Sequence, residues 1–216
     1  MKVSYLHRLI KQGENQNLDF KFEISDPGKI ARSFVAFANA SGGTILVGVN
    51  DQREITGIRS EEEIYMANHA ASRFCDPPVP YTTKEWNING KKVLEITIPE
   101  GKDKPYASIG NKSEEKVFVR VADKNIVADE VFVKSWKKKN SNHDIQITFS
   151  DEEKLLLEYL QKMPSITQAK YSGISGLTDD EAVELLSDFV ALDVIEMKYS
   201  GRELHFYLAD KLKEQD

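Results

Sequence analysis

The sequence has one cysteine, four histidines and no long apolar run. A single cysteine, Cys75, excludes an intramolecular disulfide. No cluster of Cys and His has the spacing of a structural zinc site. No apolar run approaches the roughly 18 residues that a membrane-spanning helix needs. We therefore expect a cytoplasmic protein without a membrane segment or a disulfide.

Two further features are missing. The chain has no Gly-Lys-Ser/Thr after a glycine-rich turn, so it lacks the phosphate-binding loop on which many ATPases depend. It also has no internal repeats or low-complexity tracts. With 216 residues, 40% of them apolar and 30% charged, it has the composition of an ordinary folded protein with one large domain or two modest ones.

The charge is divided unevenly along the chain. The total of −6 argues, by itself, against a protein that coats nucleic acid. However, residues 1–140 contain 22 basic and 19 acidic residues, whereas residues 141–216 contain 7 and 16. The net charges are therefore +3 and −9. We predict a first domain at 1–139, a linker at 140–150 and a second domain at 151–216.

Hydrophobic patterns predict an α+β fold with a mixed sheet for the first domain. Its expected helices lie at 3–11, from Pro27 to the Ser41-Gly42-Gly43 break, at 61–74 and at 128–137. Its expected strands lie at 18–24, 44–49, 54–58, 81–88, 92–98 and 116–121. The second domain is expected to contain helices at 151–163, 166–174 and 178–192 and a hairpin at 196–208. Three helices followed by a hairpin are typical of a small winged-helix domain.

Acidic residues gather around the first expected strand. Asp19 and Lys21 are two residues apart and so share one face of that strand. Glu14 precedes the strand and Asp51 follows the strand at 44–49, so the carboxylates converge if the two strands are neighbours. Three carboxylates and a lysine suit Mg²⁺ or Mn²⁺ and a phosphodiester. Alternatively, the strand has a solvated face and Asp51 is a turn former.

Two other segments are candidates for contact with phosphate. Asn39 and Ser41 could donate hydrogen bonds while Gly42 and Gly43 allow close approach, or the glycines could simply end a helix. In the loop at 101–106, Lys102 and Lys104 could grip a backbone while Tyr106 stacks on a base, or the loop could be solvated. The other basic candidates are Lys21, Arg32, Arg53, Arg73 and Arg120, each of which could equally be solvated surface charge.

Several runs together resemble a known family. They are LIKQGENQNLDFKFEI, IARSFVAFANASGGTILVGVNDQREITGI, PEGKDKPYA and EEKVFVRVADKNIVAD. In this order they are similar to the Schlafen AlbA-type domain, also called divergent AAA, over residues 3 to about 136. The resemblance implies an α+β domain that binds nucleic acid, found in bacterial transcriptional regulators and often followed by a winged helix.

The resemblance also implies an alternative activity. A related Schlafen core can be a metal-dependent endoribonuclease that acts on transfer RNA, with three central acids. By position, these acids correspond to Glu14, Asp19 and Asp51, and the family lysine corresponds to Lys21. This chain has Asp19 where the motif usually has Glu. Since a Schlafen nuclease encloses its substrate between two related lobes, we also expect a homodimer.

The last expected helix does not suit DNA. Residues 178–192 contain five acidic residues and no basic residue, so phosphates would repel this helix. We therefore expect residues 151–216 to contact protein. Our main prediction is a nucleic-acid-binding regulator, and the alternative is a nuclease that uses Mg²⁺ or Mn²⁺.

Overall fold

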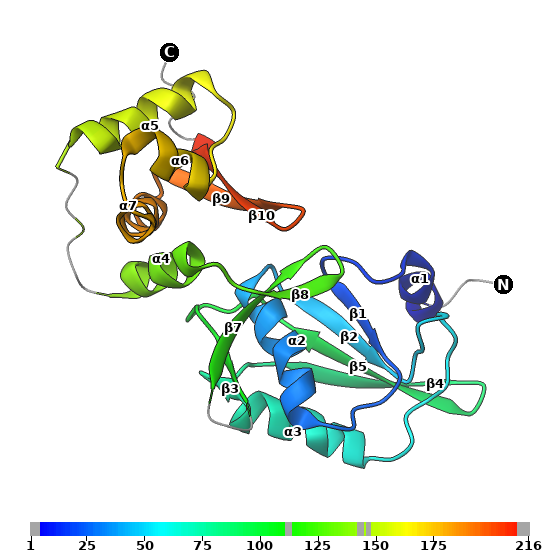
Figure 1. Cartoon of the computed structure of the whole chain (residues 1–216). Helices are drawn as coiled ribbons and strands as arrows, with labels where there is room; N and C mark the ends of the chain where they lie inside the picture. Colours follow the sequence, from blue (N-terminus) through cyan, green and yellow to red (C-terminus); the bar gives the residue numbers. More distant parts are fainter. Residues whose placement is uncertain (1–4, 111–113, 142–144, 146–147, 211–216) are drawn as a thin grey trace. The chain divides into compact units, whose positions relative to one another are not determined.

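The computed structural model describes residues 5–110, 114–141, 145 and 148–210. The chain forms two compact units, Met1–Ala128 and Asp129–Asp216. Figure 1 shows a first unit of mixed helices and strands and a second unit of helices with one hairpin. The predicted α+β fold class is confirmed.

The first unit is built around a mixed sheet in the order β1-β2-β5-β4. Its strands are β1 (Leu18–Lys21), β2 (Gly43–Val47), β4 (Thr82–Ile88) and β5 (Lys91–Ile98). β1 and β2 are parallel, and the other pairs are antiparallel. Asn89 and Gly90 both have positive φ at the β4–β5 turn, as expected for an Asn-Gly hairpin.

A second, antiparallel sheet has the order β3-β6-β7-β8. Its strands are β3 (Cys75–Asp76), β6 (Ala107–Ile109), β7 (Glu115–Val121) and β8 (Lys124–Val127). Of these, the hydrophobic pattern predicts only β7. The predicted strand at 54–58 is wrong, because only an isolated bridge joins Val49 to Ile55 there.

Three helices pack on these sheets, and they are α1 (Tyr5–Gln12), α2 (Pro27–Asn39) and α3 (Glu62–Arg73). α2 begins with Pro27 in its first turn, where the Asp26 carboxylate accepts hydrogen bonds from two backbone amides. Most of α2 is buried in a core shared with α3 and both sheets. α1 covers a separate cluster that includes Leu18 and Phe20 of β1. Both faces of β1 are therefore covered.

The second unit contains four helices and a hairpin in its described residues. They are α4 (Glu130–Asn140), α5 (Asp151–Lys162), α6 (Gln168–Ser175), α7 (Asp179–Ala191), β9 (Ile195–Ser200) and β10 (Glu203–Leu208). Ile166 pairs with Phe206 of β10 through hydrogen bonds of 3.0 and 2.8 Å. The order of α5, α6, α7 and the hairpin is compatible with a winged helix.

Helix α4 packs within the second unit. Its Val131 is fully buried in that unit's core, and Phe132 stacks on Tyr199 at 5.4 Å between ring centroids. The units therefore divide before α4, whereas the sequence predicts a first domain that extends to residue 139. The domain limits and the linker, which falls partly outside the described residues, stay predictions. Among the described residues, no helix has the length and apolar character needed to cross a membrane.

Candidate functional site

Asp19 lies in a buried polar cluster at β1. Its register opposite Ile45 of β2 places it on the face covered by α2, and it is only 3% exposed. Ser33 of α2 donates a hydrogen bond of 3.3 Å to Asp19 Oδ2. A solvated strand face is therefore the wrong description of Asp19.

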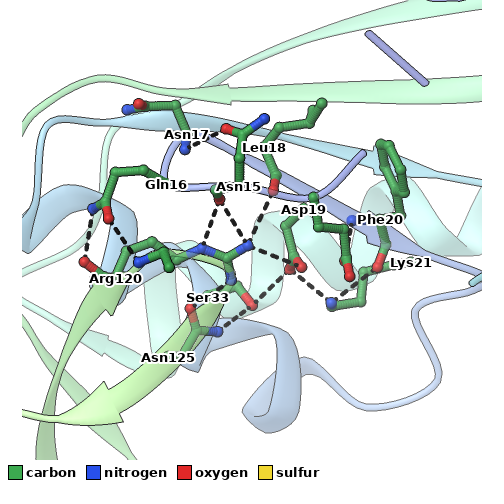
Figure 2. A network of polar contacts seen from close by, with 12 residues as sticks. Asn15, Gln16, Asn17, Leu18, Asp19, Phe20, Lys21, Ser33, Arg120 and Asn125 are labelled. Atoms are coloured by element: carbon green, nitrogen blue, oxygen red, sulfur yellow. Dashed lines mark hydrogen bonds and ion pairs between the residues drawn. The ribbon is translucent and has the colours of Figure 1, made fainter. Parts of the chain in front are cut away.

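Two cations neutralise Asp19, as Figure 2 shows. Lys21 Nζ lies 2.6 Å from Asp19 Oδ2, and Arg120 Nη2 lies 3.5 Å from Oδ1. Burial alone would raise the pKa of Asp19, but the Lys21 charge, hydrogen bonds and Arg120 hold it below its usual value. Asp19 is therefore a buried, ionised carboxylate whose charge is balanced by Lys21 and Arg120.

Arg120 reaches this cluster from β7 and is buried, with 1% of its side chain exposed. It donates to the backbone oxygens of Asn15 and Leu18 and to Asn125 Oδ1, at 3.0 to 3.3 Å. These bonds fasten the turn before β1 to the second sheet. The predicted contact of Arg120 with nucleic acid is corrected, because its donors are used inside the unit.

Glu14 joins the same cluster. Its Oε1 accepts a hydrogen bond of 2.8 Å from the Phe20 amide. Burial, followed by a hydrogen bond with Asp19, raises the pKa of Glu14. The structure therefore brings Glu14, Asp19 and Lys21 together.

Asp51 does not join them. β1 and β2 are parallel neighbours, and the amides of Gly48 and Val49 donate to the Lys21 carbonyl oxygen. A turn at 50–54 then leaves Asp51 exposed. Within the described residues, no three His, Cys, Asp or Glu side chains form a group that could hold a metal ion.

The donor set of this arrangement does not fit Mg²⁺ or Mn²⁺. These ions need several oxygen ligands, whereas the Asp19 oxygens already face Lys21, Arg120 and the Ser33 hydroxyl. The two cations supply the positive charge that a metal would bring. We derive no metal-dependent step from this cluster.

The glycines after α2 are needed for packing. Gly42 has a φ of 75°, and a Cβ there would lie 2.8 Å from both Ile98 O and Glu100 N. A Cβ on Gly43 would overlap the Phe37 ring. The helix-ending interpretation therefore accounts for both glycines without a ligand.

Asn39 and Tyr106 are also internal. Asn39 Nδ2 donates to the carbonyl oxygens of Tyr106 and Phe118, and its Oδ1 accepts from the Tyr106 amide at 2.8 Å. Each of these two side chains is 3% exposed. The predicted phosphate contact of Asn39 and base stacking of Tyr106 are corrected, because the Asn39 side chain joins α2 to Phe118 of the second sheet and the Tyr106 ring is buried in the core.

The two predicted phosphate-contact segments nevertheless meet at the surface. The Gly101 amide donates to the Ala38 carbonyl oxygen at 2.8 Å, and Lys104 Nζ donates to the Ala40 carbonyl oxygen at 3.1 Å. Ser41 and Lys102 are exposed beside these contacts, and Lys104 is half-buried. We call Ser41, Lys102 and Lys104 the turn–loop surface.

A basic groove is a feature that the sequence patterns did not reveal as a whole, although Arg32 is among the predicted basic candidates. It has a volume of about 210 Å³ and lies between α2 and the β6–β7 strands, with Lys29, Arg32 and Lys116 in its wall. The spacing of Lys29 and Arg32 on one helix is a usable signal. Lys116 comes from a distant strand, which spacing does not reveal.

Comparisons with known proteins identify a family. The model of the family described as Schlafen, AlbA_2 matches residues 14–129, more than half of the chain. The polar cluster, the turn–loop surface and the basic groove all lie within this range. No curated protein matches the chain.

Two solved structures are similar in part. One is the DIP2311 protein of Corynebacterium diphtheriae, at 20% identity and a TM-score of 0.46, with 77% of this chain and 31% of that chain covered. The other is the N-terminal domain of a protein from Nitrosomonas europaea described as related to the ATP-dependent DNA helicase RecG. Its identity is 14% and its TM-score 0.36, with 68% of this chain and 98% of that chain covered. This chain thus spans about a third of the length of the Corynebacterium protein.

Proposed function

The chain belongs to the Schlafen, AlbA_2 family, and on this premise we propose that its first unit binds nucleic acid. One observation carries the proposal. The turn at 41–43 after α2 and the loop at 101–106 lie about 60 residues apart in sequence. Hydrogen bonds from Gly101 and Lys104 join them into the turn–loop surface. This surface lies within the range that the family model matches.

The chemistry of the turn–loop surface suits a phosphate backbone. Lys102 is an exposed point charge, and the exposed Ser41 hydroxyl can donate a hydrogen bond to a phosphate oxygen. Lys104 is held near the turn by Ala40 O and by Glu100, whose Oε1 lies at 2.7 Å. Contacts of this kind give affinity without reading base sequence.

For the whole protein, we propose a transcriptional regulator that acts in the cytoplasm as a homodimer, with a winged-helix-like second unit that contacts protein. The acidic face of α7 supports a protein partner over DNA, since Asp179, Asp180 and Glu181 in its first turn would repel phosphates.

Charge reversal at Lys102 tests the interface. Lys102→Glu should weaken binding of labelled DNA and RNA about tenfold in a mobility-shift assay, because an attraction becomes a repulsion. Lys124→Glu is the matched control, since it makes the same change at an exposed position on β8. Equal losses in both variants would show that only the total charge matters, and would contradict the proposed interface.

The same samples test the nuclease alternative. They are incubated with labelled transfer RNA in Mn²⁺ or in EDTA, beside a Glu14→Ala/Asp51→Ala variant. Because the carboxylates do not form one donor set, we expect intact RNA in both conditions. Metal-dependent fragments that disappear in the variant would show that the protein cleaves RNA.

A further inference from the structure

The basic groove lies on the first unit, and its lining includes none of the residues of the turn–loop surface. Arg32 and Lys29 enter it from α2, and Lys116 enters from β7. All three are exposed residues. The Arg32 guanidinium carbon lies 5.9 Å from the centre of the Phe118 ring, which is 9% exposed and forms part of the groove wall. An aromatic wall therefore supports one of the three cations.

Two acidic residues also line the groove, and their contacts differ. Asp26 accepts hydrogen bonds of 2.8 and 3.3 Å from the amides of Gly28 and Lys29 through the same oxygen, Oδ1. Its charge is thus directed at the start of α2, and those amides are not open donors. Glu114 pairs with Lys116 at 3.4 Å, with both side chains more than half exposed. An exposed pair of this kind is weak, so an anion can compete for Lys116.

The size of the groove limits what fits. A volume of about 210 Å³ is below the roughly 300–1,000 Å³ of pockets that enclose drug-sized ligands. It suits a single small anionic group. Three cations from two elements, among them an arginine with a planar fork of donors, match the several oxygens of a phosphate group.

We propose that the groove is a second phosphate site, in which Lys29, Arg32 and Lys116 bind one phosphate group. If the phosphate group belongs to a nucleic-acid backbone, the site is part of the proposed nucleic-acid interface, and this inference rests on the proposed function. If the group is free phosphate, the inference does not depend on nucleic-acid binding. In both cases the chemistry is the same, and the experiment separates the two sources.

The test uses the full chain and two probes. Amide chemical shifts are followed by NMR while inorganic phosphate is added, and the affinity for a labelled single-stranded oligonucleotide is measured by fluorescence anisotropy. Lys29→Gln/Arg32→Gln removes two of the cations, and Lys124→Gln is the control. We expect phosphate to shift the amides of Gly28, Arg32 and Gly110 in the wild type but not in the double variant.

The oligonucleotide titration measures an affinity and its dependence on salt. The double variant should lose about two- to fivefold in affinity per cation, and the slope of log K against log salt should become shallower by about 0.7 per lost contact. A shift with phosphate but no effect on the oligonucleotide would assign the site to free phosphate. No amide shift together with unchanged oligonucleotide affinity would overturn the inference.

One variant is expected to bind phosphate more tightly than the wild type. Glu114→Gln removes a negative charge from the groove and releases Lys116, so phosphate affinity should rise about two- to fivefold. General destabilisation would not increase affinity, so this result separates a site from a structural effect. If the wild type binds no oligonucleotide, the proposed function fails, while the phosphate titration still decides whether the groove is a site.

Discussion

Asp19 and Arg120 form the most deeply buried ion pair among the described residues, with 4% and 1% of their side chains exposed. Such a pair costs free energy to desolvate, and this cost is offset only where the remaining polar atoms are bonded. Here Lys21, Ser33 and the backbone oxygens of Asn15 and Leu18 provide those bonds. We infer that Arg120 acts mainly by joining β1 to the second sheet.

Arg120→Met is expected to lower the free energy of unfolding by about 3–5 kcal/mol, because it leaves Asp19 with one cation and methionine offers no donor in place of the guanidinium. The free energy of unfolding of Arg120→Lys should lie between those of the wild type and Arg120→Met, since lysine keeps the charge but loses the fork of donors. Urea unfolding of the full chain measures the effect, with Lys124→Met as an exposed control. A loss below about 1 kcal/mol would contradict the structural role.

Acid should weaken the contribution of Asp19. Its pKa is lowered in the folded state, so its carboxylate adds stability above the unfolded value of about 3.9, and this is lost as the pH falls through the folded pKa. Glu14 acts in the opposite direction, since its pKa is raised, and it adds stability at low pH that is lost as the pH rises.

The pH prediction is measured in a Glu14→Gln background, which removes the opposing group. The difference in unfolding free energy between this protein and its Asp19→Asn derivative should be largest near pH 7 and shrink below about pH 4. A difference that stays constant with pH would show that Asp19 is not held ionised by the fold.

The limits of prediction from sequence are clear at this scale. The sequence predicts one cluster of Glu14, Asp19, Lys21 and Asp51, and the structure brings together the first three but not Asp51. The spacing does not reveal that Asp19 is buried, because its partner Arg120 lies 101 residues away. Asn39 is likewise bound to Tyr106 across 67 residues. Polar residues in a motif can bind a ligand or stabilise the fold, and only their long-range contacts distinguish the two roles.

At the scale of elements, prediction followed the strength of the local signal. Alternating or continuous apolar residues locate β1, β2 and β5, and Asn89-Gly90 marks the turn between β4 and β5. β3 and β6 have only two and three residues, which is too short for periodicity, and the four residues of β8, Lys124–Val127, do not alternate between polar and apolar. The β7–β8 turn contains Ala122 at a φ of 53°, where no Asn-Gly signal exists.

The glycine turn after α2 offers an element-level prediction. Gly43→Ala should destabilise the protein by about 1–3 kcal/mol, because the new Cβ would overlap the Phe37 ring. Gly173→Ala in α6, where a Cβ has open space, should be neutral or stabilise by up to about 1 kcal/mol. Urea unfolding compares the two, and equal effects would show that close packing is not what Gly43 provides.

α4 and α7 are joined by ion pairs. Lys138 Nζ lies 2.6 Å from Glu184 and 2.7 Å from Asp188, and Lys134 lies 2.6 Å from Glu184. Lys134, followed by Lys138, holds the pKa of Glu184 below its usual value. Part of the acidity of α7 therefore balances the lysines of α4.

A charge swap tests this pairing. Lys138→Glu should cost about 0.5–1 kcal/mol of stability, and combining it with Glu184→Lys should recover part of the loss. A double-mutant cycle by urea unfolding measures the coupling, which should shrink in about 1 M salt, where the Debye length is about 3 Å. Additive effects at low salt would show that the ion pair contributes nothing.

For the whole molecule, the position of α4 changes the distribution of charge. Divided at the compact units, residues 1–128 contain 18 basic and 17 acidic residues, and residues 129–216 contain 11 and 18. The net charges are +1 and −7, less different than the +3 and −9 of the division at residue 140. The first unit is nearly neutral, so the proposed affinity for nucleic acid would have to come from local groups of lysine and arginine.

The most direct test of nucleic-acid binding is a salt titration. Fluorescence anisotropy of the full chain with labelled DNA and RNA is measured from low to physiological salt. We predict saturable binding whose log K falls linearly with log salt, with a shallower slope for Lys102→Glu than for Lys124→Glu. No binding at any salt concentration, or binding that ignores salt, would contradict this prediction.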